Sequence, residues 1–523
     1  MTFSVTRRTL LAGTAGSAAL FLARGAAAAE RLEVGAPEPF SFERLVKQAR
    51  ALAGGPYTAP PSPAPEVTEA IDYAAHGAIR FRTALAPFAD GEGHYPVTFF
   101  HLGRFFKKTV RMHLVEDGQA REVIYNPRYF DMPADSPAHE LPRDSGFAGF
   151  RFQEAGQRDD WRTQDWLAFL GASYFRAIGA LGQYGLSARG VAVNVAGGTG
   201  EEFPDFTAFY IGPADGPEAV QPVWALLEGP SLTGAFHFAC RRGFGVIMDV
   251  EARLFVRRDI ERLGIAPLTS MFWYGEHGRE RLNDWRPEVH DSDGLALWTG
   301  NGERLWRPLE NPPTLSVSSF LDTDPKGFGL MQRDRNFDHY LDGVNYERRP
   351  SLWVEPLGQW GKGAVQLVEL PTDDEIHDNI VAFWVPAAPA RAGQELRFDY
   401  RLHWLDEHPY PPAELALTAA TRLGRGGEPG NPRPPGLHKF VVEFEGRPLK
   451  GIPWGIMPKP VITASRGEVS YVFAEPIPNT TRWRAQWDLS VEGSAPVELR
   501  LYMELGGRPL TETWLYQFRP PGG

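Results

Sequence analysis

Hydrophobic and polar positions alternate along most of this 523-residue chain. From about residue 78, apolar side chains recur at every second position in short runs, which is the period of a half-buried β-strand. Glycine and proline interrupt these runs about every ten residues, and helices do not alternate regularly with them. The pattern predicts an all-β protein and argues against a doubly wound sheet or an α/β barrel. The clearest runs are 191–195, 206–211, 235–239 and 246–256.

One amphipathic helix is predicted before the strands begin. Apolar residues recur there at helical spacing, and Ser41 is suited to cap the first turn. Residues 54–66 are rich in proline and glycine and predict a loop. Residues 164–177, rich in aromatic side chains, are compatible with a second helix. The apolar positions of the first helix are Phe40, Phe42, Leu45, Val46, Ala49 and Leu52.

A change in composition near residue 406 divides the chain into two parts. Residues 406–416 are rich in proline and charge and predict a linker. Beyond it, short alternating runs extend over about 110 residues, which is the size of an immunoglobulin-like sandwich. We therefore predict a large β-sandwich over 30–405, built from two sheets packed face to face, and a smaller one over 417–523.

The first 29 residues predict an export signal rather than part of the fold. Arg7 and Arg8 are followed at once by an apolar run over 10–22, and the alanines at 26–29 offer a cleavage site. The run is too short to span a bilayer as a helix. The arginine pair favours twin-arginine export, and an ordinary secretory signal is the alternative. Either route predicts a periplasmic protein without a membrane anchor after cleavage.

Charge and cysteine content exclude several classes of protein. The formal net charge is −11, so nucleic-acid binding is not expected. Cys240 is the only cysteine, which excludes an internal disulfide and any multi-cysteine metal centre. The 13 histidines are scattered, without the spacing of a zinc protease, and no dinucleotide-binding glycine motif is present. We therefore predict neither a metal nor an organic cofactor.

Residues 271–384 interleave aromatic side chains with carboxylates, arginines and amides. Sugar rings stack their C–H faces on tryptophan and tyrosine, and their hydroxyls bond to carboxylates and guanidinium groups. The composition therefore favours a carbohydrate cleft. Each tryptophan taken alone is more typical of a core, and each arginine of a surface ion pair. The side chains we predict to bind sugar here are Trp273, Tyr274, Glu276, Trp306, Arg335, Trp353 and Trp360.

Five motifs in this region are specific: Arg286–Leu295, Gly302–Leu309, Gly327–Arg333, Arg349–Val354 and Asp378–Trp384. In them the chain resembles the periplasmic glucan biosynthesis proteins G and D (OpgG/OpgD, also called MdoG/MdoD). The resemblance covers nearly all of the mature chain, and the leader favours the D branch over the G branch.

This resemblance implies a large sandwich of the galactose-mutarotase type and a small immunoglobulin-like sandwich. It also implies a role in making osmoregulated periplasmic glucans, whose backbone is β-1,2-linked glucose. The expected partner is therefore a β-1,2-glucan, and an association with an inner-membrane glucan synthase is compatible with this role.

Family members are similar to inverting glycoside hydrolases. Inversion uses one protonated carboxyl to protonate the leaving oxygen and a second route to activate water, with the two groups about 6.5–9.5 Å apart. Asp378 matches the family's acid in the Asp-Asn-Ile-Val-Ala-Phe-Trp motif. Burial beside Phe383 or Trp384, or nearby carboxylates such as Asp374 and Glu375, would help to keep it protonated.

Asp291 is our assignment for the base side, where it acts on water either directly or through a relay of hydroxyls. Tyr346 and Arg349 are expected to hold the glucan. Three functions remain open: an endo-β-1,2-glucanase, a transglycosylase that closes the glucan through an α-1,6 bond, and a non-catalytic glucan-binding or assembly factor.

Overall fold

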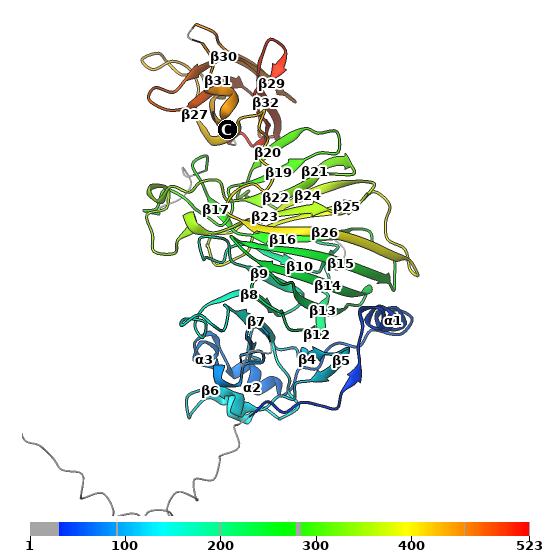
Figure 1. The fold of residues 1–523 in the computed structure, drawn as a ribbon. Coiled ribbons are helices and arrows are strands. Elements are labelled where there is room, and N and C mark those ends of the chain that lie inside the picture. Colours follow the sequence, from blue (N-terminus) through cyan, green and yellow to red (C-terminus); the bar gives the residue numbers. More distant parts are fainter. Residues whose placement is uncertain (1–30, 90–92, 198–199, 279–283, 454, 522–523) are drawn as a thin grey trace, which may run out of the picture.

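The computed structural model describes residues 31–89, 93–197, 200–278, 284–453 and 455–521. Strands dominate this part of the chain, so the predicted all-β class is confirmed. The predicted export signal lies outside the described residues. In Figure 1 the amino-terminal helices and short strands lie at the bottom, the two large sheets fill the middle and the last strands lie at the top.

A 16-stranded sheet runs through the described part of the molecule. Its longest strands alternate buried and half-buried positions, as the period of two predicts. In spatial order its strands are β1 (Glu38–Pro39), β5 (Gln119–Glu122), β4 (Arg111–Glu116), β12 (Asp205–Ile211), β13 (Gln221–Glu228), β14 (Leu232–Arg242), β15 (Val246–Val256), β26 (Glu395–Leu405), β23 (Ser351–Pro356), β22 (Gly327–Met331), β19 (Gly294–Trp298), β20 (Arg304–Pro308), β34 (Thr513–Phe518), β32 (Val497–Leu505) and β29 (Lys459–Ala464), with β33 (Arg508–Pro509) beside β32.

A second, ten-stranded sheet shares a core with the first. Phenylalanine rings meet between them: Phe150 and Phe209 lie 5.0 Å apart, and Phe169 and Phe238 lie 5.3 Å apart, centroid to centroid. The two sheets therefore meet through aromatic side chains, and the predicted sandwich architecture stays a prediction. The strands are β21 (Ser316–Thr323), β24 (Lys362–Glu369), β25 (Ile380–Pro386), β16 (Leu263–Ser270), β10 (Ser187–Arg189), β9 (Tyr174–Ala177), β8 (Asp165–Leu170), β7 (Gly149–Gln153) and β3 (Val97–Phe100), with β11 (Val191–Val193) beside β16.

The predicted amphipathic helix is confirmed as α1 (Phe42–Ala53). The Ser41 hydroxyl accepts a hydrogen bond from the backbone N–H of Arg44 and caps the first turn. Leu45 and Ala49 bury the apolar side of α1 against β13–β15. Two short helices follow, α2 (Pro65–Ala70) and α3 (Tyr73–Gly77).

The helix considered for 164–177 is wrong, because this segment forms the hairpin of β8 and β9. Four consecutive residues of β8, Trp166 to Phe169, are buried, so the segment lacks the alternation of a half-exposed strand. A fully buried strand and a buried helix give the same continuous apolar run. Gly171, at φ 62°, makes the turn that separates the two strands.

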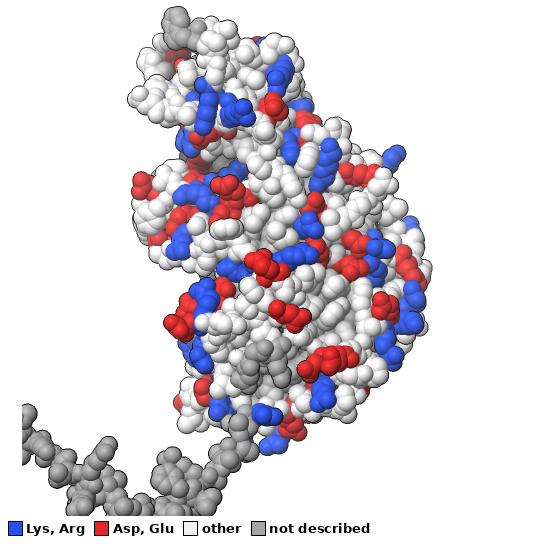
Figure 2. Space-filling view, in the orientation of Figure 1, with Lys and Arg blue, Asp and Glu red and all other residues white. Residues whose placement is uncertain are grey.

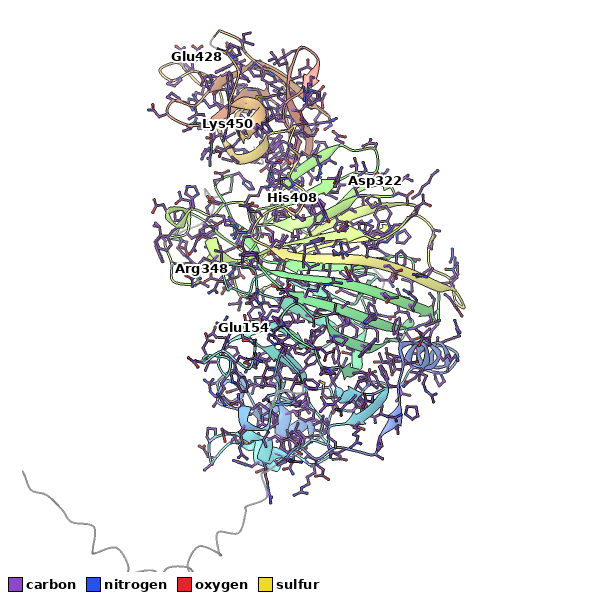
Figure 3. All side chains as sticks on the ribbon, in the orientation of Figure 1. Glu154, Asp322, Arg348, His408, Glu428 and Lys450 are labelled. Atoms are coloured by element: carbon purple, nitrogen blue, oxygen red, sulfur yellow. The ribbon has the colours of Figure 1, made fainter. Side chains whose placement is uncertain are left out.

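The last hundred residues continue the large sheet and add a separate one. β34 pairs in parallel with β20, which joins residues 305–306 to residues 513–514. A four-stranded sheet faces β29, β32 and β34 across a second core, in which Trp487 and Trp514 lie 5.7 Å apart. His408, labelled in Figure 3, lies at the junction with the larger part of the molecule. The boundary at 406–416 and the immunoglobulin-like and mutarotase-like types stay predictions. The four strands are β27 (Leu417–Arg425), β28 (Leu437–Glu445), β31 (Arg482–Ser490) and β30 (Glu468–Pro476).

Candidate active site

Asp378 lies at one end of the ten-stranded sheet, two residues before β25 begins. The Tyr174 hydroxyl, at the start of β9, donates a hydrogen bond to Oδ2 of Asp378. Thr269 of β16 in turn donates its hydroxyl to the Tyr174 oxygen at 2.7 Å. Because β9, β10, β16 and β25 are neighbours in the sheet, three distant segments are brought to one carboxyl group.

The predicted burial of Asp378 beside Phe383 and Trp384 is wrong. Both aromatic rings are fully buried in β25, whereas the Asp378 side chain is exposed. The chain leaves the sheet at Asn379, so Asp378 projects outward before the buried run begins. An exposed carboxyl at the end of a rigid strand is accessible to a large polymer.

Asn379 fixes the loop that carries Asp378. Its side-chain oxygen accepts from the Phe272 N–H at 2.8 Å, and its amide nitrogen donates to the carbonyls of Phe272 and Leu370 at 2.9 and 3.0 Å. Asn379 is 2% exposed. The amide therefore closes the loop over residues 370–379 and joins it to β17 (Phe272–Tyr274).

Asp291 and Arg349 form an ion pair next to this loop. Asp291 follows β18 (Val289–His290) and is 6% exposed, and Arg349 donates from Nη1 to its Oδ1. The guanidinium also lies over the Tyr346 ring, 4.2 Å from its centroid. Burial lowers the pKa of Arg349 to about 10, against the opposing charges of Glu375 and Asp378. Both predicted catalytic carboxylates therefore interact with one guanidinium, Asp291 through a hydrogen bond and Asp378 through its charge.

Glu375 ties the same loop to the turn η6 (Tyr346–Arg348). Its Oε2 accepts from the Tyr346 hydroxyl at 2.6 Å and from Nη1 of Arg286 at 2.7 Å. Burial and the Glu375 hydrogen bond raise the pKa of Tyr346 well above its ordinary value. Arg348, labelled in Figure 3, marks this turn on the left of the molecule. Figure 2 shows blue and red side chains close together on the loops in that region.

Arg335 binds the backbone of the segments that carry the site. Its guanidinium donates to the backbone carbonyls of Glu347, Arg349 and Asp406 at 3.0, 2.6 and 2.7 Å. Burial lowers the pKa of Arg335 below its ordinary value. Three backbone carbonyls thus hold this guanidinium, and Arg335 braces the turn that ends in Arg349.

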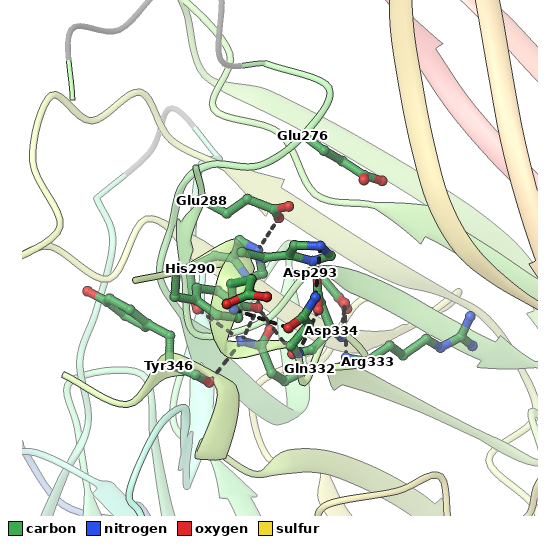
Figure 4. A network of polar contacts seen from close by, with 12 residues as sticks. Glu276, Glu288, His290, Asp293, Gln332, Arg333, Asp334 and Tyr346 are labelled. Carbon is green, nitrogen blue, oxygen red and sulfur yellow. Dashed lines mark hydrogen bonds and ion pairs between the residues drawn. The ribbon is translucent and has the colours of Figure 1, made fainter. Parts of the chain in front are cut away.

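Two predicted sugar-binding residues line a groove. Trp273 and Tyr274 of β17 border a cavity of about 490 Å³ between the large sheet and β27–β28. Trp273 is half-buried, and its indole N–H has no hydrogen-bond partner among the described residues. Glu276 lies apart from the other labelled side chains in Figure 4 and accepts from the backbone N–H of Thr421. Burial and the charge of Glu288 raise the pKa of Glu276 to about 8.

Trp306, Trp353 and Trp360 are core residues in this structure. They are 4%, 0% and 8% exposed. The first two pack into the core shared with the carboxy-terminal strands, and Trp360 packs at 5.7 Å against Phe398. The structure therefore does not bring these three rings together with Asp378 on an accessible surface.

We expect Trp353→Phe to lower the free energy of unfolding by about 1–2 kcal/mol, because the smaller ring leaves a cavity in a closed core. Its affinity for β-1,2-glucan should stay unchanged, since the ring exposes no surface. Chemical denaturation and isothermal titration calorimetry measure the two quantities. Weaker glucan binding with unchanged stability would contradict this placement.

Sequence reasoning missed Tyr174, Arg189 and Phe203. The Arg189 guanidinium lies 4.7 Å from the Tyr174 ring centroid and 5.4 Å from that of Phe203, whose side chain is 51% exposed. Burial and the charge of Asp378 raise the pKa of Tyr174 to about 12, so its hydroxyl stays a donor at neutral pH. No local signal marks these residues, because only the sheet brings them to Asp378.

Comparison with known proteins gives the family. The model of the family described as "Periplasmic glucan biosynthesis protein, MdoG" matches residues 40–518. The chain belongs to this periplasmic glucan biosynthesis family. Glucans biosynthesis protein D 2 of Ralstonia nicotianae is 59% identical over 527 residues, which cover 99% of this chain and 98% of that protein. Glucans biosynthesis protein D of Xanthomonas campestris pv. campestris is 48% identical over 495 residues, covering 93% and 92%.

These findings confirm the predicted family and its place in periplasmic glucan biosynthesis. Both relatives carry the name of protein D, in agreement with the branch favoured by the leader. Within the described residues, no helix combines the length and apolar character that crossing a bilayer requires.

Proposed function

We propose that this chain cleaves β-1,2-glucan with inversion, and that Asp378 protonates the leaving oxygen. One observation carries the proposal: the half-buried Tyr174 hydroxyl, itself bonded to Thr269, holds an exposed carboxyl by one oxygen. Among the described residues the other oxygen has no hydrogen-bond partner, so it can face a glycosidic bond. A general acid needs this combination of fixed orientation and access to substrate.

The base side belongs to Asp291. Its carboxylate is buried and bound to Arg349, which favours activation of water through an intervening hydroxyl over direct contact. Arg349 orients the Asp291 carboxylate through its hydrogen bond, and its guanidinium lies 4.2 Å from the centroid of the Tyr346 ring. A sugar hydroxyl bound beside this guanidinium would complete the relay.

Incubation of the purified protein with linear β-1,2-glucan tests the proposal. Short linear products of inverted configuration support hydrolysis. Cyclic products with an α-1,6 bond mean that the same acid serves transfer to a sugar hydroxyl, which is the second candidate function. The names of the relatives do not distinguish the two. Binding without any bond change would leave the chain as an assembly factor and overturn the proposal.

Tyr174→Phe should lower kcat up to roughly tenfold while KM changes little, because a hydrogen bond contributes about 0.5–1.5 kcal/mol. The phenyl ring keeps the packing of β9, but it no longer donates to Oδ2 of Asp378, so the carboxyl loses its fixed orientation. Initial rates over a range of glucan concentrations separate kcat from KM. Wild-type kcat would mean that Tyr174 only packs against the sheet.

A further inference from the structure

A second cluster of ionisable side chains lies beside the proposed active site. Glu288, Asp334 and His339 each offer a ligand atom, and these atoms all lie within 4.8 Å of one another. Glu288 immediately precedes β18 and is buried. Asp334 lies three residues before the turn η5 (Phe337–His339), and His339 ends this turn; both are half-buried. Figure 4 shows Glu288 and Asp334 with the neighbouring polar side chains.

An unpartnered oxygen belongs to a residue that lines a cavity together with two of these carboxylates. Asp293 binds the backbone N–H groups of Arg333 and Asp334 through Oδ2, both at 2.9 Å. Its Oδ1 is buried and has no hydrogen-bond partner among the described residues. Asp293, Glu288 and Asp334 line a cavity of about 40 Å³, which has room for a single ion or water. A buried acceptor without a donor is rare in native proteins and calls for a missing partner.

The cations near the cavity bond to other groups. Glu276 lines the cavity too, but its raised pKa keeps it largely protonated at neutral pH, and Arg422 lies 3.5 Å from it. Arg333 directs its guanidinium to Glu512 at 2.6 Å. His290 bonds to Glu288 at 3.0 Å and uses its other nitrogen for Gln332, also at 3.0 Å. Arg333 and His290 act on Asp293 through their charge, but among the described residues neither forms a hydrogen bond with its Oδ1.

We propose that Glu288, Asp334 and His339 bind one divalent cation, with the free oxygen of Asp293 facing it. A set of carboxylates with one imidazole suits Zn²⁺ or Mn²⁺ better than Mg²⁺, which prefers oxygen ligands and retains water. The cation replaces the hydrogen bond between His339 Nδ1 and Asp334, and the neutral imidazole keeps its proton on the nitrogen that does not bind the ion. Ligand bonds of about 2.0–2.2 Å require the side chains to turn inward slightly.

Such an ion would join two segments that carry the proposed active site. Glu288 is three residues before Asp291, and the loop after Asp334 leads to Tyr346 and Arg349. Gln332 already links these segments, because it bonds to His290 and donates to the Tyr346 carbonyl at 3.0 Å. This consequence for catalysis rests on the proposed function, whereas binding of the ion does not.

Calorimetric titration of untagged, chelator-treated protein with Zn²⁺, Mn²⁺, Ca²⁺ and Mg²⁺, each alone, tests the site. We expect one Zn²⁺ or Mn²⁺ per chain, with a higher Tm in its presence. Glu288→Gln and His339→Ala should each weaken binding at least tenfold. Asp338→Asn is the matched control, because this exposed acid lies on the same turn outside the cluster and should bind like the wild type.

His339→Ala should still fold, because this half-buried side chain can be removed without leaving a cavity in a core. A loss of metal binding in this variant is therefore not explained by misfolding. The proposal is overturned if the metal-free protein binds none of the four ions. It is equally overturned if the two ligand variants bind as the wild type does. Because the readouts are heat and Tm, a protein without glucanase activity could still pass this test, so failure of the proposed function is distinguishable.

Discussion

Asp378→Asn should reduce turnover of β-1,2-glucan about a thousandfold, within the range for loss of a general acid. An amide cannot deliver the proton that the leaving oxygen needs. Its oxygen can still accept the Tyr174 hydrogen bond, so the loop should keep its position. We therefore expect unchanged Tm and nearly unchanged glucan affinity. Release of reducing ends measures turnover, and titration calorimetry measures affinity.

Asp373→Asn is the matched control for this experiment. Asp373 is exposed on the same loop, and its side chain forms no hydrogen bond or ion pair with the described residues, so its substitution should leave kcat within about twofold of the wild type. Wild-type turnover by Asp378→Asn would show that another group supplies the proton. Loss of turnover together with a lower Tm would instead indicate a damaged loop.

The fold could be predicted wherever one face of a strand is exposed. The runs over 246–256 and 497–505 alternate and coincide with β15 and β32. The hairpin at 165–177 could not be predicted this way, because both faces of β8 are buried and the alternation disappears. The pairing of β20 with β34, more than 200 residues apart in sequence, depends on three-dimensional packing that no local period records.

The candidate site was predictable only where a motif is contiguous. Asp378 and Asn379 stand together in one motif, and the structure places both at the end of β25. Tyr174 lies 204 residues from Asp378 in the sequence, so no pattern near either residue predicts their hydrogen bond. Composition also could not separate core from stacking tryptophans. A signal was present, since Gly294 and Gly327 leave room for the rings of Trp306 and Trp353.

Asp291→Asn should slow turnover at least tenfold, because the path that accepts the proton of water loses its terminal carboxylate. It should also lower Tm, since the substitution removes the opposite charge from the half-buried guanidinium of Arg349. Rate and stability therefore fall together, and the rate alone cannot identify a base. Added azide separates the two effects, because this anion attacks carbon without giving up a proton.

We expect azide to restore glycosyl transfer in Asp291→Asn and to leave Asp378→Asn inactive, since the leaving oxygen still needs an acid. The α-configured glycosyl azide, detected by mass spectrometry and NMR, would report inversion directly. Asp342→Asn is the matched control: it removes a buried carboxylate from an arginine, Arg286, at 3.2 Å, and should lower Tm without azide-dependent activity. A slow Asp291 variant that azide fails to accelerate would place Asp291 with Arg335 as a residue that only holds Arg349 in position.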